Sequence, residues 1–211
     1  MRNLIKSLAS IAVLAAALVS PAQADLVLDL TPGGTATPCG GCSGGVTYGW
    51  SFTVRDAITI DGLGMWDAGA DGLGQPSVQI GLWSSAGALL ASTTVTNGST
   101  QIASANLAGE WLFESIANLT LAAGDYRIGA VFTSATPLAQ VGSPYTTIAG
   151  VALTGGVQST TTGLADPTAQ FNFPIFGPTM RLANTVPEPA SVVLVGMALL
   201  AVGAAGRRRN R

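Results

Sequence analysis

Large hydrophobic residues recur at every second position in several short stretches of the chain. The clearest stretch is 46–54, VTYGWSFTV, and the same period returns in 77–83, 110–116 and 125–132. Successive side chains of a strand point to opposite faces, so each stretch predicts a strand with one buried face. The residues that we expect to be buried are Tyr48, Trp50, Phe52 and Val54; Val78, Ile80 and Leu82; Trp111 and Phe113; and Tyr126, Ile128, Ala130 and Phe132.

Turn-forming residues separate these stretches. Ser85-Ala86-Gly87 and Thr96-Asn97-Gly98-Ser99 are two such clusters, and no internal segment shows helical periodicity. Short alternating segments at this spacing are typical of an antiparallel β-sandwich with about ten strands. We therefore predict an all-β fold, either a jelly roll or an immunoglobulin-like sandwich, over residues 25–185.

The first 24 residues have the organisation of a signal peptide. Arg2 and Lys6 precede an apolar run over 8–19, which is shorter than the roughly 20 residues of a membrane-spanning helix. Ala22 and Ala24 are the small residues that a signal peptidase requires at its cleavage site. The predicted mature protein begins at Asp25 and is exported.

The other end combines an apolar run with a basic cluster. Residues 190–206 are apolar throughout, and an α-helix of that length covers about 25 Å, close to the thickness of a membrane's hydrocarbon core. We expect a transmembrane helix here. The basic residues behind it resist translocation and act as a stop-transfer signal on the cytoplasmic side. They are Arg207, Arg208, Arg209 and Arg211.

A short proline-containing motif stands before this helix, in Val186-Pro187-Glu188-Pro189-Ala190. Proline lacks an N–H and restricts the backbone, so the motif is an extended peptide beside the membrane. Pro-Glu-Pro, a short apolar helix and an arginine cluster together resemble the PEP-CTERM sorting signal of Gram-negative bacteria. The resemblance covers residues 186–211. It implies a membrane-embedded exosortase that processes the chain near the motif, in a bacterium that makes exopolysaccharide.

A second resemblance concerns the middle of the chain. From about Gly49 to Phe132, the order GWSFTV, ITIDGLGMWDAGADGLG, VQIGLWSSAGALLASTTV and LAAGDYRIGA is similar to an uncharacterised β-sandwich module often seen ahead of PEP-CTERM signals. The resemblance implies a fold and brings no chemistry with it.

Charge and composition exclude several classes of function. The chain has no histidine, which removes the commonest general base and metal ligand. Between Asp25 and Val186 there are ten acidic and three basic residues, a formal charge of −7. Such a surface is unsuited to nucleic acid, because it cannot neutralise phosphates.

The only two cysteines are Cys39 and Cys42, in a loop rich in Gly, Pro and Thr. A disulfide that closes a tight loop is the expectation for an exported protein. Redox activity, a link to another chain and free thiols are the alternatives.

Asp67 and Asp71 are separated by small residues in DAGADGLG. The favoured interpretation is a tight turn in which aspartate side chains bond to the backbone. The alternative is a weak Ca²⁺ site, assisted by Asp61, since carboxylates and loop carbonyls are ligands for hard cations. No other cofactor is predicted.

Two further sets of side chains invite a functional interpretation. Glu110 and Glu114 could form a carboxylate pair for hydrolysis, but we expect both on the solvated face of a strand, opposite Trp111 and Phe113. Trp66 or Trp83, if exposed, could stack on sugars, although tryptophans at strand ends more often belong to the core.

These observations predict a non-enzymatic protein of the cell surface or extracellular matrix, delivered by an exosortase after signal peptidase has acted. The alternative is a carbohydrate-binding or adhesive module that engages exopolysaccharide, with or without Ca²⁺. A carboxylate-based hydrolase is a third hypothesis.

Overall fold

The structure, a computed structural model, describes residues 25–33, 36–38, 44–133, 137–139, 143–171 and 174–183. These residues contain strands and no helix, and thus no helix that could cross a membrane. The strands are β1 (Leu28–Leu30), β2 (Ala36–Pro38), β3 (Val46–Val54), β4 (Ile58–Ala68), β5 (Ser77–Ser84), β6 (Leu89–Thr96), β7 (Thr100–Ala103), β8 (Gly109–Leu121), β9 (Gly124–Phe132), β10 (Pro137–Ala139), β11 (Tyr145–Thr147), β12 (Val151–Thr162), β13 (Ala169–Phe171) and β14 (Pro178–Leu182).

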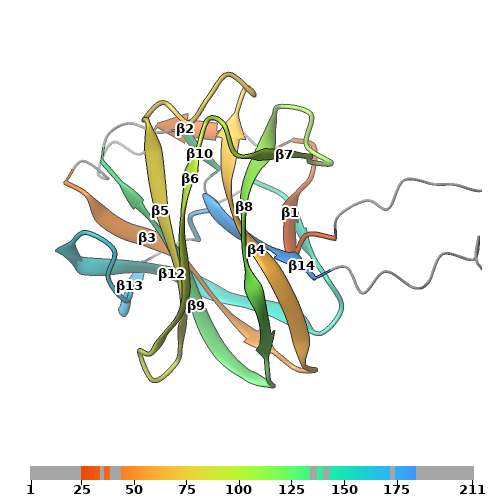
Figure 1. The fold of residues 1–211 in the computed structure, drawn as a ribbon, viewed down its shortest axis with the longest axis vertical. Coiled ribbons are helices and arrows are strands. Elements are labelled where there is room, and N and C mark those ends of the chain that lie inside the picture. Colours follow the sequence, from red (N-terminus) through yellow and green to blue (C-terminus); the bar gives the residue numbers. More distant parts are fainter. Residues whose placement is uncertain are drawn as a thin grey trace, which may run out of the picture.

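Two larger sheets make up most of the described residues (Figure 1). One has six strands in the order β13-β12-β3-β9-β5-β6, and the other has four in the order β14-β4-β8-β7. Two short pairs, β1 with β11 and β10 with β2, complete the pairing, and every pair is antiparallel. The prediction of an all-β fold with antiparallel sheets is confirmed.

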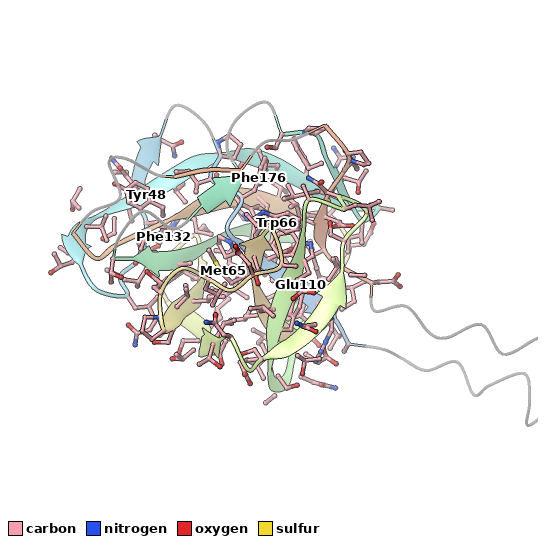
Figure 2. The ribbon with its side chains drawn as sticks, turned by 90° about the horizontal axis from the view of Figure 1, so that it is seen from above. Tyr48, Met65, Trp66, Glu110, Phe132 and Phe176 are labelled. Carbon is pink, nitrogen blue, oxygen red and sulfur yellow. The ribbon has the colours of Figure 1, made fainter. Side chains whose placement is uncertain are left out.

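Both larger sheets contribute to one hydrophobic core. Trp50 and Phe52 of β3 enter it from the six-stranded sheet, and Leu63 and Met65 of β4 enter it from the four-stranded sheet. Figure 2 shows Met65 and Trp66 well inside the outline of the molecule. The indole N–H of Trp50 donates to the carbonyl of Pro178 over 2.8 Å, which joins the two sheets across the core. Burying each such side chain contributes roughly 2–3 kcal/mol to folding.

The buried faces were predicted well, but in each of the four strands some residues of the other face are buried too. Every residue that we expected to be buried is buried, except Tyr126, which is half-buried. In β8, Leu112 is buried as well as Trp111 and Phe113. This part of β8 is therefore covered on both faces, and an alternating pattern cannot represent that.

The six-stranded sheet is also covered on part of its second face. Trp83 points away from the core residue Leu82, and its ring lies over Gly81, where an added Cβ would stand 2.3 Å from the ring. Arg127, opposite Trp83 on β9, forms an ion pair of 2.7 Å with Asp166. This pair fixes Asp166, in the segment after β12, on the face of the sheet that carries Arg127, and Trp83 is buried on the same face.

Candidate functional site

We call the region where β4 ends and β8 begins the far end, because it lies at the other end of β4 from the place where β14 ends. It holds Asp67, Asp71, Glu110, the turn residue Asn97 and Leu107. Asp67 and Glu110 are direct partners in the antiparallel pairing of β4 with β8, so both side chains lie on the same face. This register brings together acidic residues that are far apart in the sequence.

Asp67 is buried, with 3% of its surface exposed. Its two carboxylate oxygens accept hydrogen bonds from the backbone N–H of Gly72 at 3.2 and 3.0 Å. The loop needs unusual backbone: Gly69, Gly72 and Ala70 have φ of 87°, 109° and 53°, and the last value is rare for a residue with a Cβ. The aspartate thus holds a strained turn in place, as the favoured interpretation of the sequence expects.

Burial raises the pKa of Asp67 above its usual range, because the charged form loses its hydration. The negative charges of Glu110 and Asp71 raise this pKa further, while the N–H groups of Gly72 and Asp71 lower it. The carboxylate is therefore anchored by backbone amides and at the same time opposed by two like charges.

An open depression of about 450 Å³ adjoins this loop, lined by Asp71, Gly72, Gly74, Gln75, Pro76 and Asn97. Asp71 is exposed there. Across the described part of the chain, no three or more acidic or cysteine side chains gather as a metal site would require. Asp61, which the calcium hypothesis recruits, lies instead beside Arg181, with 2.6 Å between Oδ1 and Nε.

Glu110 and Glu114 share one face of β8, as expected, but that face is not open to solvent. Leu112 lies between them and is buried against Met65, its partner on β4. Both glutamates are half-buried, and Glu114 accepts a hydrogen bond of 2.6 Å from the Ser99 hydroxyl. The expectation of a solvated face is wrong, because loops and the opposite sheet cover β8 on this side.

Neither Trp66 nor Trp83 presents a ring to solvent. Their exposed fractions are 2% and 3%. Trp66 packs edge-on against Trp111, its partner across β4 and β8, with ring centroids 5.2 Å apart. The hypothesis that either ring stacks on a sugar is therefore not supported by their positions.

The opposite region, which we call the exit end, is where β14 ends. It comprises Asp25, Ile58, Thr59, Thr120 and Ala183. The N–H of Leu182 donates to the carbonyl of Asp25 over 2.9 Å, and the N–H of Ala183 donates to the carbonyl of Thr59 over 2.9 Å. Thr59 and Thr120 then join their hydroxyls at 3.0 Å. The chain thus leaves β14 beside the predicted mature N-terminus.

Strand β14 is held on both of its edges. It pairs with β4 from Pro178 to Leu182, and on its other edge Leu26 forms a bridge with Arg181. The N–H of Val27 donates to the carbonyl of Met180 over 2.9 Å. Arg181 also pairs with Asp61 and lies over the Phe113 ring. Sequence reasoning missed this strand, whose five residues are too few for a clear alternation.

The segment after β14 is similar to a known family. Residues 185–209 match the family model of the PEP-CTERM protein-sorting motif. The chain carries a PEP-CTERM motif. The motif implies an exported protein that an exosortase processes, and proteins with this motif typically reach the cell surface of Gram-negative bacteria. No curated protein and no solved structure matches the chain.

Several predicted sites lie outside the described residues. They are the signal peptide with Ala22 and Ala24; the loop with Cys39 and Cys42; the motif residues Val186 to Ala190; the helix over 190–206; and the arginines from Arg207 to Arg211. The disulfide, the cleavage site and the stop-transfer role stay predictions.

Proposed function

We propose that this protein is a non-enzymatic component of the cell surface or extracellular matrix, whose two-sheet β-sandwich body is the cargo of an exosortase. The observation that carries the proposal is the position of the motif. Strand β14 ends at Leu182, and the PEP-CTERM match begins at residue 185. A body closed by β14 is thus joined directly to its sorting signal.

The hydrogen bonds of Asp67 and Glu114 support a structural role for these two acids. The Asp67 carboxylate accepts a hydrogen bond from the backbone N–H of Gly72, and the Glu114 carboxylate accepts one from the hydroxyl of Ser99. The absence of histidine from the sequence removes the commonest partner for a serine or cysteine nucleophile. We infer that these carboxylates fix loops and do not act on a substrate.

The proposal is tested by changing the motif alone. A chain with Pro187→Ala, Glu188→Ala and Pro189→Ala, carrying a peptide tag after the exposed Leu107, is expressed in a bacterium that has the sorting enzyme. We expect it to remain at full length in the inner membrane, whereas the tagged parent chain loses its C-terminal segment and leaves that membrane. Cell fractionation and the mass of the tagged product measure both.

Ser191→Ala, two residues beyond Pro189, is the matched control and should behave as the parent chain does. Release of the triple variant with the same product mass as the parent chain would contradict the proposal.

A further inference from the structure

The exit end and the sorting motif are joined by a very short tether. Pro187 follows Ala183 by four residues. Since extended chain covers at most about 3.6 Å per residue, Pro187 lies within about 15 Å of Ala183. A compact body of about 160 residues has a radius of gyration of about 15 Å, so its diameter is larger than this tether. A protein that holds Pro187 is therefore close enough to touch the exit end.

Strand β14 cannot lengthen the tether without breaking the body. Its release would expose the buried Met180 and would take from Leu28 the hydrogen bond that the Thr179 hydroxyl donates over 2.8 Å. It would also leave the buried Trp50 indole N–H without its acceptor, the carbonyl of Pro178. A buried donor without a partner is costly, so the paired strand is the favoured state during sorting.

The surface around the tether has the character of a contact region. Leu26, Ile58, Leu119 and Leu182 are partly buried apolar residues at this end. The charge of Arg181 is already paired with Asp61. The exit end thus combines several partly exposed apolar side chains with the exposed carboxylate of Asp25, and apolar surface of this kind suits a partner that is itself embedded in a membrane.

We propose that the exit end is the docking surface for the membrane-embedded sorting enzyme, and that this enzyme processes the chain while β14 is still paired on both edges. This inference rests on the proposed function. Docking at the exit end would also fix the orientation of the body relative to the sorting enzyme. The 13 residues of β8 connect the two ends and span about 40 Å. The far end, where β4 ends and β8 begins, lies at the other end of this strand pair (Figure 1) and would point away from the enzyme.

Site-specific crosslinking tests the docking surface. A photo-crosslinking amino acid is placed at Thr120, which is exposed at the exit end, or at Leu107, which is 94% exposed at the far end. We expect an adduct with the sorting enzyme from position 120 and none from position 107. Adducts of equal yield from both positions, or none from position 120, would overturn the proposal.

A disulfide staple tests whether β14 stays paired. Leu26 and Arg181 face each other between two hydrogen bonds, Leu182 N–H to Asp25 and Val27 N–H to Met180, which makes them a closely spaced antiparallel pair. In a chain with Cys39→Ser and Cys42→Ser, the variants Leu26→Cys and Arg181→Cys are combined. Close pairs of this kind meet the distance requirement of a disulfide.

The stapled chain should be processed at a rate within about twofold of the Arg181→Cys single variant, which corresponds to about 0.4 kcal/mol. A stapled chain that accumulates unprocessed and is processed after addition of a reductant would overturn the proposal. Should the double variant fail to fold, the crosslinking result decides alone.

The chain with the altered Pro187, Glu188 and Pro189 separates the two proposals. If that chain is processed normally, the proposed function fails. If processing depends on the motif but position 120 gives no adduct, only the docking surface fails.

Discussion

The exit end and the far end differ in the charges that lie beside their buried or half-buried carboxylates. At the exit end, Asp61 faces the guanidinium of Arg181 at 2.6 Å. At the far end, Asp67 faces Glu110 across the β4–β8 pair and is close enough to Asp71 for both charges to raise its pKa. The Asp61 carboxylate is thus paired with an opposite charge, whereas the Asp67 carboxylate is held beside two like charges.

The difference shows which interactions stabilise each end. Backbone pairing on both edges of β14 closes the exit end, and its ion pair is an addition to that pairing. The far end depends on a strained turn in which Ala70 has a φ of 53°. Strain and charge repulsion persist only where the surrounding structure imposes them, so the hydrogen bonds from Gly72 to Asp67 must hold this turn against both.

The largest expected effect concerns the exit strand. Met180→Ala removes a fully buried side chain between the two sheets and should lower the free energy of unfolding by about 2–5 kcal/mol. Met180→Leu keeps the volume and should cost less than about 1.5 kcal/mol. Chemical denaturation of the exported protein measures both. Equal stabilities of the two variants would show that β14 is peripheral, and the contrast between the ends would then disappear.

A smaller effect is expected at the far end, and it depends on pH. Because the pKa of Asp67 is higher in the folded state, that state binds more protons than the unfolded chain between the two pKa values. Stability should therefore fall as pH rises from the ordinary aspartate pKa through the raised one. Asp67→Asn keeps an acceptor for Gly72 and removes the repulsion, so it should gain about 0.2–1 kcal/mol at neutral pH.

Denaturation curves of the parent chain and this variant over a pH series measure the effect. The gain should vanish in acid, where Asp67 is protonated in both states. Asp71→Asn, at an exposed position, is the control and should change stability less. A gain that is the same at every pH would assign the effect to packing.

The smallest effect is expected from the ion pair at the exit end. Asp61→Asn should cost no more than about 1 kcal/mol, because the pair is partly solvated. The loss should shrink at high salt, which screens such pairs. Thermal melts at low and high salt test this, and a cost larger than that of Met180→Ala would reverse our ranking of backbone pairing over charge.

Local patterns explain what could be predicted. The stretch 46–54 coincides with β3, because its aromatic residues alternate with polar or small ones over the whole strand. The turn at Asp67 could also be predicted from the sequence, since its hydrogen-bond donor Gly72 is only five residues away. By contrast, the partial burial of Glu110 and Glu114 depends on what covers β8, and no property of the segment 110–116 encodes that.

The sequence by itself determined that this protein carries a sorting motif and that its middle forms strands. Both features depend on residues that are close together in the chain. Only the tertiary structure decided where the sorting motif leaves the body. The reason is the pairing of β14 with residues 25–27 on one edge and with β4 on the other. Those partners are more than a hundred residues away, and backbone hydrogen bonds between such distant segments leave no local pattern in the sequence.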